Sequence, residues 1–200
     1  MDPPSNRPAA PNALLGLFGL SSLITALDFT IVYVALPDIA GDLGFSSHAL
    51  QWVVSGYAIS FGGLLLLAGR LSDLLGRRRV FLAGMTLFAG GSMLGGLATA
   101  PELLIGARII QGLGAAALFP STLALVNTTF AEGRQRDRAL GLWAAAGAGG
   151  LSLGALLGGV LTEAVGWRGV FFVTVPLTLV GAVGAVALLR ATRRASAPRL

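Results

Sequence analysis

Two long apolar stretches of the chain are separated by the segment Gly69-Arg70-Leu71-Ser72-Asp73-Leu74-Leu75-Gly76-Arg77-Arg78-Arg79. The stretches on either side, residues 50–68 and 80–98, contain no Asp, Glu, Lys or Arg. A helix needs about 20 predominantly apolar residues to cross a bilayer, so each stretch is long enough. Arginines in a short loop favour the cytoplasmic side of a membrane. The segment therefore predicts a short cytoplasmic linker between two membrane-spanning helices.

The same pattern continues along the chain. Of its 200 residues, 54% are hydrophobic and only 12% are charged, whereas soluble domains carry roughly 25% charged residues. Mean hydropathy is +0.79. Six apolar blocks are long enough to span a bilayer, near residues 13–36, 50–68, 80–98, 103–126, 139–161 and 170–189. We therefore expect an all-α transmembrane fold with six helices between residues 13 and 190.

The fourteen basic residues are all arginine, and they alternate between the linkers. Twelve fall in the N-terminal segment, the second and fourth linkers and the C-terminal segment: Arg7, Arg70, Arg77, Arg78, Arg79, Arg134, Arg136, Arg138, Arg190, Arg193, Arg194 and Arg199. The positive-inside rule then predicts a multi-pass protein of the inner (plasma) membrane with both termini cytoplasmic. Residues 1–12, with four prolines, are expected to form a disordered cytoplasmic tail, and residues 191–200 a basic tail or the start of a linker.

Several function classes find no support in the sequence. The chain has no cysteine and a single histidine, His48, so neither a disulfide nor a cysteine–histidine metal site is expected. No nucleophile–base pair and no phosphate-binding Walker loop is present. The arginines lie in loops between apolar blocks, so they report topology and not nucleic-acid binding. We expect no enzyme activity, no metal and no cofactor.

The opening segment resembles motif A of the major facilitator superfamily, in the linker between helices 2 and 3. Its match rests on Gly69, Asp73, Gly76, Arg77 and Arg78. The departure is at position 74, where leucine stands for a residue that is often basic. The resemblance implies an N-terminal six-helix bundle of two inverted three-helix repeats, with the aspartate as a gating residue in a shaped loop. An ordinary positive-inside loop would explain the arginines but not this spacing.

A second signal lies inside the fourth apolar block, where Arg108 and Gln111 share one helix face. An arginine at mid-span costs at least ~2.5 kcal/mol on insertion scales, so such residues usually face a cavity or a partner. The sequence Arg108-Ile109-Ile110-Gln111-Gly112 resembles motif B of proton-coupled members of the superfamily. A structural or snorkelling arginine near the outer interface is the alternative.

The first apolar block contains Asp28, within Leu27-Asp28-Phe29-Thr30-Ile31-Val32-Tyr33. A carboxylate is costly to ionise inside a bilayer, so it can exchange protons or pair with a cationic substrate. The segment resembles the helix-1 signature of the fourteen-helix drug:proton antiporters, the EmrB/QacA branch, with Tyr33 in place of the usual asparagine. Alternatively, the acid lies near a water-filled vestibule and neighbouring polar groups such as Thr30 satisfy it.

The fifth block carries Gly150, Gly154, Gly158 and Gly159. Glycines in a membrane helix let helix backbones approach closely, so a packing role is the simplest interpretation. The spacing resembles motif C, the antiporter signature of helix 5, with Ala155 where that motif has proline. Proline would remove a backbone hydrogen bond and kink the helix. The missing proline weakens the case for antiport but not for the superfamily.

Together these motifs predict one half of a transporter that exports drugs or other small molecules by proton-coupled alternating access. The expected partners are the lipid bilayer, protons, a cationic or lipophilic substrate, and a second half of six or eight helices in cis or in trans. Two alternatives remain open. One is a metabolite facilitator or symporter of the same superfamily. The other is a transport-incompetent six-helix interaction module or truncated product.

Overall fold

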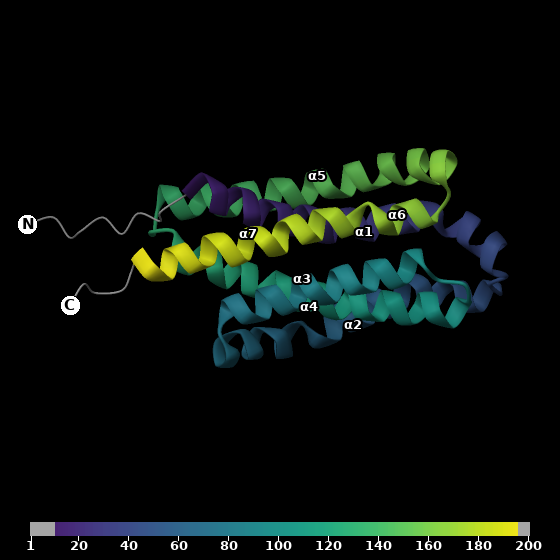
Figure 1. Ribbon diagram of the computed structural model, residues 1–200, viewed down its shortest axis with the longest axis horizontal. Coiled ribbons are helices and arrows are strands. Elements are labelled where there is room, and N and C mark those ends of the chain that lie inside the picture. The colour runs from purple at the N-terminus through teal and green to yellow at the C-terminus, as the bar shows by residue number, and fades with distance from the viewer. Residues whose placement is uncertain (1–10, 196–200) are drawn as a thin grey trace, which may run out of the picture.

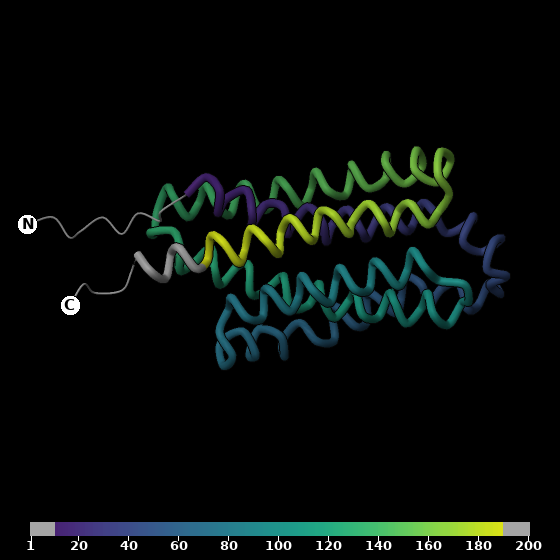
Figure 2. The backbone as a smooth tube through the Cα atoms, in the orientation of Figure 1, coloured from purple at the N-terminus to yellow at the C-terminus, as the bar shows by residue number. Residues whose placement is uncertain are grey.

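The computed structural model describes residues 11–195, with side chains described up to residue 189. It contains α1 (Pro11–Leu43), α2 (Ser47–Leu75), α3 (Arg77–Gly96), α4 (Pro101–Thr129), α5 (Arg134–Val165), α6 (Arg168–Phe172) and α7 (Thr174–Ala195). Figures 1 and 2 show these helices running side by side along one axis. The expected all-α class is confirmed. Of the terminal tails predicted at residues 1–12 and 191–200, residues 1–10 and 196–200 lie outside the described residues, whereas α1 begins at Pro11 and α7 continues to Ala195.

Five helical segments are long and apolar enough to cross a membrane: α1, α2, α4, α5 and the α6–α7 unit over Arg168–Leu189. The sixth expected span is present as α3, but its 20 residues begin with three arginines and include five glycines. Those residues lower its hydropathy below that of the other spans. Six predicted helices are therefore present, and five of them are membrane-length by composition.

The helices extend beyond the apolar blocks that predicted them. α2 continues through most of the arginine-rich linker to Leu75, and α3 begins at Arg77, so Gly76 alone separates them. Leucine and arginine favour helix, and an apolar block marks the thickness of the hydrocarbon and not the end of the helix. Gly76 has a φ of +94°, a conformation open to glycine at little cost. The linker is thus a single-residue turn.

The last predicted span is interrupted near its start, where α6 ends at Phe172 and α7 begins at Thr174. Pro176 has no N–H, so it cannot donate the usual helical hydrogen bond to the carbonyl four residues earlier, at Phe172. The chain at Val173 keeps a helical conformation, with φ −64° and ψ −29°. The interruption is therefore local, and the two helices act as one spanning unit.

Figure 1 places the connections of the bundle at two opposite ends. The start of α1, the α2–α3 turn, the α4–α5 connection and the end of α7 lie at one end. The α1–α2, α3–α4 and α5–α6 connections lie at the other. The arginine-rich linkers around Arg77 and Arg136 thus share one end of the molecule, as the charge pattern requires.

The opposite end is tied together by Arg168 at the start of α6. Its Nη1 donates to Asp42 Oδ2 at 2.7 Å, and its Nη2 donates to the Ala98 carbonyl at 3.1 Å. The indole Nε1 of Trp167 also donates to Asp42 Oδ2, at 2.9 Å. These bonds link the end of α1, the α3–α4 connection and the start of α6.

Helices α1 and α5 form the most extensive helix pair in the bundle, and glycines line their contact. Three buried glycines of α5 face successive turns of α1: Gly150 opposite the Leu23 carbonyl, Gly154 opposite the Leu27 carbonyl and Gly158 opposite the Ile31 carbonyl. A Cβ at Gly150 would lie 2.6 Å from the Leu23 oxygen, whereas one at Gly159 would meet nothing within 4 Å. Three of the four motif glycines therefore pack against α1, and Gly159 does not.

This packing predicts different costs for two alanine substitutions in the same helix. Gly154→Ala places a methyl group against the Leu27 carbonyl and the Thr30 hydroxyl, so it should force α1 and α5 apart. We expect destabilisation of about 1–3 kcal/mol, as for other overpacked interiors, seen as a lower melting temperature by circular dichroism in detergent micelles. Gly159→Ala is the matched control and should melt like the native chain. Equal melting of the two variants would contradict this packing.

Candidate functional site

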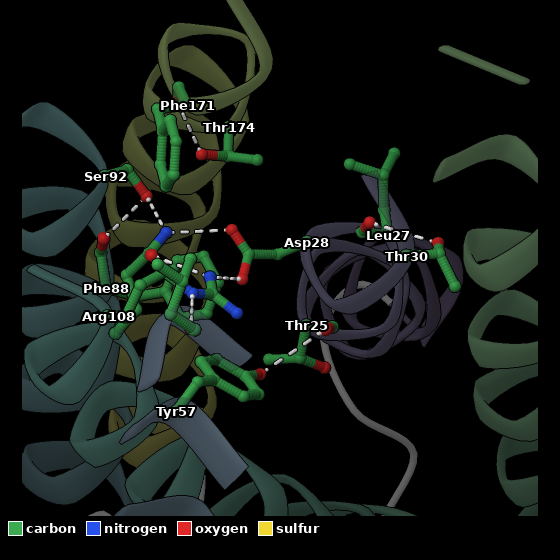
Figure 3. Close-up of polar contacts among 12 residues, drawn as sticks. Thr25, Leu27, Asp28, Thr30, Tyr57, Phe88, Ser92, Arg108, Phe171 and Thr174 are labelled. Atoms are coloured by element: carbon green, nitrogen blue, oxygen red, sulfur yellow. Dashed lines mark hydrogen bonds and ion pairs between the residues drawn. The ribbon is translucent and has the colours of Figure 1, made fainter. Parts of the chain in front are cut away.

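An ion pair lies in the interior of the bundle, between α1 and α4. Asp28 is 0% exposed and Arg108 is 1% exposed. The Arg108 Nη1 atom donates to Asp28 Oδ2 at 2.5 Å (Figure 3). Two charges taken out of water are tolerated only when they are paired and their other hydrogen-bonding groups are satisfied. This contact excludes the snorkelling alternative for the arginine, because its head group is buried against a counter-charge.

Gln111 completes the pair from the same face of α4. Its Oε1 accepts from Arg108 Nη1 at 2.8 Å, and its Nε2 donates to Asp28 Oδ1 at 2.8 Å. The Nε2 group also donates to Ser92 Oγ on α3, at 2.9 Å. The reverse amide orientation would set oxygen against carboxylate, so the network fixes the direction of the side chain.

The remaining bonds of the cluster reach backbone carbonyls on two more helices. Arg108 Nε donates to the Val53 carbonyl of α2 at 3.1 Å, and Ser92 Oγ donates to the Phe88 carbonyl of α3 at 2.8 Å. Four helices, α1 to α4, thus contribute to one hydrogen-bonded cluster. A buried polar network that joins several helices favours a single packing arrangement.

The hydrogen bonds at Asp28 are those of an ionised carboxylate. Both carboxylate oxygens accept hydrogen bonds, one from Arg108 and one from Gln111. An ionised carboxylate is a pure acceptor, whereas a protonated one carries a hydroxyl that must donate. The arrangement therefore fits the ionised acid.

Tyr57 of α2 covers the guanidinium of Arg108. The Cζ atom of Arg108 lies 4.3 Å from the centre of the tyrosine ring. Such a cation–π contact contributes roughly 0.5 to 2 kcal/mol, depending on how far it is desolvated. The Tyr57 hydroxyl donates to the Thr25 carbonyl of α1 at 3.5 Å, which is the long limit of a hydrogen bond.

Beside the ion pair lies an apolar pocket of about 560 Å³, formed by α1, α2, α4 and α5. Five aromatic side chains line it: Phe29, Tyr57, Phe61, Phe119 and Trp143. Consecutive rings in that order contact one another, with centroids 5.1 to 6.3 Å apart. Such pockets bind ligands mainly through apolar and aromatic surface.

The motif A residues lie apart from this cluster, at the arginine-rich end of α2 and α3. Asp73 is exposed, and among the described residues its carboxylate has no partner. Arg77 Nη1 donates to the Ala124 carbonyl of α4 at 3.4 Å. Within the described part of the chain, Ser72 Oγ and Arg78 Nε are buried polar atoms without a hydrogen bond. The segment thus offers polar groups that this bundle leaves unused.

The structure brings together three of the predicted residues, Asp28, Arg108 and Gln111, and adds others. Thr30, the suggested partner of the acid, instead donates to the Leu151 carbonyl of α5 at 2.8 Å. Ser92 and the Val53 carbonyl were not predicted. For Ser92 the sequence does offer a signal, which is a serine next to a glycine inside an apolar block. In the structure, that glycine lets α3 approach α4 closely, since a Cβ at Gly91 would lie 2.9 Å from the Ala107 carbonyl. No sequence signal marks the Val53 carbonyl.

Among the described residues, no group of three or more His, Cys, Asp or Glu side chains could hold a metal ion.

Membrane-length helices around a buried ion pair and an apolar pocket define a polytopic membrane protein. Residues 18–200 match the profile of the Major Facilitator Superfamily, and the chain belongs to that superfamily. Membership of a transporter family confirms that the chain is not an enzyme.

Curated relatives include several drug-resistance and export proteins. The chain is 45% identical over 180 residues to the puromycin resistance protein pur8 of Streptomyces alboniger, covering 90% of the chain and 36% of that protein. It is 43% identical over 195 residues to the cephamycin export protein CmcT of Amycolatopsis lactamdurans, covering 98% and 39%. It is 39% identical over 155 residues to the methyl viologen resistance protein SmvA of Salmonella typhimurium, covering 78% and 31%.

These matches confirm the relationship to drug:proton antiporters of the fourteen-helix branch that the motifs indicated. The chain spans about a third of the length of the curated relatives it matches.

The ion pair predicts that removing Arg108 alone strongly destabilises the chain, and that removing the charge of Asp28 as well restores much of the lost stability. Arg108→Met should leave the Asp28 carboxylate buried without its counter-charge, which typically costs about 3–5 kcal/mol. Adding Asp28→Asn removes that charge, so the double variant should regain much of the loss in thermal unfolding. Arg70→Met, at an exposed arginine, is the control and should leave the melting temperature unchanged. A double variant no more stable than Arg108→Met would contradict the pairing.

Proposed function

We propose that the chain forms the N-terminal six-helix half of a proton-coupled exporter of drugs or other small molecules. The observation that carries this proposal is the Asp28–Arg108 pair, which is buried and bonded as an ionised acid beside an aromatic pocket. The names of the relatives, which refer to puromycin, cephamycin and methyl viologen, support export of small molecules. Alternating access would require a second half of six or eight helices, in cis or in trans.

In this proposal the proton acts through the hydrogen-bond network. A proton on Asp28 would remove the negative charge that pairs with Arg108 and so weaken the hydrogen bonds that hold the cluster. The guanidinium is left buried with its counter-charge neutralised, which is unfavourable by several kcal/mol. The bundle must rearrange to hydrate or re-pair the arginine. Proton binding and release would thus switch the half-transporter between two packings.

The aromatic pocket is the proposed contact for substrate. Its five rings offer stacking surfaces, while Ser22 and Thr25 add hydroxyl groups to the lining. This lining suits lipophilic molecules, including cations whose charge is delocalised over rings. The pocket opens on a face to which α1, α2, α4 and α5 contribute. In the assembled transporter the second half would close that face.

The second half would also cover helices that this chain leaves exposed. Among the spans, α2 and α5 bury the smallest share of their residues, and their exposed positions include Leu66, Leu74, Leu156 and Val160. We propose that Asp73 gates at this boundary, by pairing with a basic group of the second half. The aspartate is exposed beside two unused buried polar atoms, Ser72 Oγ and Arg78 Nε, which supports such a partner.

A facilitator or symporter of the same superfamily is the second candidate. Ala155 favours it, because α5 runs as one unbroken helix from Arg134 to Val165 at the position where the antiporter signature has a proline. Exchange against a proton gradient separates the two candidates.

The export proposal predicts that Asp28→Asn abolishes proton-driven transport. The asparagine keeps the size of the side chain but cannot bind or release a proton. The measurement is accumulation of methyl viologen in everted vesicles in which the chain is reconstituted with its second half, with and without an imposed proton gradient. We expect at least a tenfold loss of gradient-driven uptake. Glu163→Gln, at an exposed acid outside the site, should transport normally. Full gradient-driven uptake by Asp28→Asn would overturn the proposal.

The proposed topology places the arginine-rich end and both termini in the cytoplasm. Because the chain has no cysteine, single cysteines report topology without background. We expect Glu132→Cys to be shielded from a membrane-impermeant maleimide in intact cells and His48→Cys to be labelled. Both positions are exposed, and in Figure 1 their connections lie at opposite ends. The reverse labelling pattern would invert the topology.

A further inference from the structure

Tyr57 belongs to both the aromatic pocket and the contacts of the ion pair. Its ring covers the guanidinium of Arg108 and also lines the pocket. Neither Asp28 nor Arg108 lines that pocket, and both are buried. Figure 3 shows the tyrosine beside Arg108, with its hydroxyl directed toward α1 at Thr25. The ring therefore forms a wall between the open pocket and the buried carboxylate.

The hydrogen bond and ring contacts of the Tyr57 side chain are individually weak. The Tyr57 hydroxyl makes one long bond, 3.5 Å to the Thr25 carbonyl. Its ring lies nearly parallel to that of Phe61, at 17°, with centroids 6.3 Å apart, so the stacking is strongly offset. The ring also contacts Phe29, at 51° with centroids 6.3 Å apart, and makes the cation–π contact with Arg108. The tyrosine is thus buried, and one of its contacts is with the same arginine that pairs with Asp28.

We infer that Tyr57 is a gate that makes binding of a planar aromatic ligand in this pocket and access of water-borne protons to Asp28 mutually exclusive. When the pocket is empty, its volume of about 560 Å³ gives the ring room to swing away from Arg108. Water can then follow into the space that the ring leaves. A ligand stacked among the rings of Phe29, Phe61 and Trp143 fills that room and holds the tyrosine closed.

A planar aromatic ligand is the occupant that this lining fits. The five rings contact one another in a series, and three of their four contacts are edge-on or tilted. A flat ring system inserted among them can make further contacts of the same kind, worth about 0.5–1.5 kcal/mol per ring pair. A compact aliphatic cation cannot make them. The gate would thus respond to stacking surface.

Among the groups near Asp28 and Arg108, Tyr57 is the one that also lines the pocket. Within the described residues, Arg108 and Gln111 of α4 bond to it, and Ser92 of α3 is reached through Gln111. Arg108 and Tyr57 are the charged or titratable groups among these neighbours. Near the cluster α6 and α7 bring the neutral Phe171 and Thr174 (Figure 3). On the other side, α5 packs against α1 through glycines. Tyr57 is therefore a positioning residue, which acts on Asp28 through Arg108.

The inference rests on the proposed function only for the role of the gate in transport. Whether Tyr57 shields Asp28 from water can be tested without measuring transport. The purified 200-residue chain in detergent micelles is treated with a water-soluble carbodiimide and an amine, which modify carboxyl groups that water reaches. Mass spectrometry of the peptide containing Asp28 gives the modification rate at that residue. Asp28→Asn assigns the signal. Ethidium serves as the planar aromatic probe, and tetraethylammonium as a cation without rings.

We expect Tyr57→Ala to modify Asp28 at least tenfold faster than the native chain and Tyr57→Phe to remain close to native, because the ring is the barrier. Ethidium should slow modification in the native chain but not in Tyr57→Ala, and tetraethylammonium should have no effect. Phe119→Ala is the matched control, because it removes a ring of the same pocket whose ring contacts are with Phe61 and Trp143 and not with Tyr57. Its modification rate should stay native.

The inference is overturned if Tyr57→Ala reacts no faster than the native chain, or if Phe119→Ala accelerates modification as much. It is also overturned if tetraethylammonium protects as well as ethidium. Should Tyr57→Ala lose its helical circular dichroism, Tyr57→Leu decides by the same criteria, since leucine keeps apolar packing without a flat ring. Loss of transport in Asp28→Asn bears on the proposed function alone, so the two failures are distinguishable.

Discussion

A guanidinium in the interior of a membrane bundle needs a counter-charge, and the rest of this structure depends on meeting that need for Arg108. The arginine cannot be neutralised by losing its proton, so its burial requires Asp28 from α1 and acceptors from α2 and α4. All the contacts of the cluster follow from this. Because the pair is one of opposite charges, the same contact that stabilises the bundle is the one through which the proposed proton coupling would act.

Close approach of the helices is what allows these short bonds to form. Gly112 lies beside Gln111 on α4, and a Cβ there would lie 2.6 Å from the Tyr57 carbonyl of α2. At Gly91 of α3, a Cβ would lie 2.7 Å from Gln111 Cγ. The glycines of α5 hold α1 in the same way. Small residues therefore set the helix spacing that lets Asp28, Arg108 and Ser92 meet.

The sequence was enough to locate Asp28 and Arg108, because the free-energy cost of a charged side chain inside an apolar block can be recognised without a structure. An acid and an arginine inside apolar blocks stand out, and the i, i+3 spacing of Arg108 and Gln111 indicates a shared face. What it could not provide is the direction of side chains across helices. Thr30 was a reasonable neighbour for Asp28 two positions along α1, yet it points to α5, on another side of the helix. Tyr57 became part of the site only through the packing of α2 on α4.

The position of Tyr57 bears on how a half-transporter could couple two ligands that never touch. Direct competition for one carboxylate would require the substrate to reach Asp28, which is buried and lies outside the pocket lining. A ring shared by the pocket and Arg108 would remove that requirement, because the ligand would act on the ring that covers the arginine and the proton on the acid that pairs with it. Each would then bias one two-state element through a different contact, which is the physical condition for linkage between two sites. Aromatic surface, and not charge alone, would then decide which molecules are coupled to the proton.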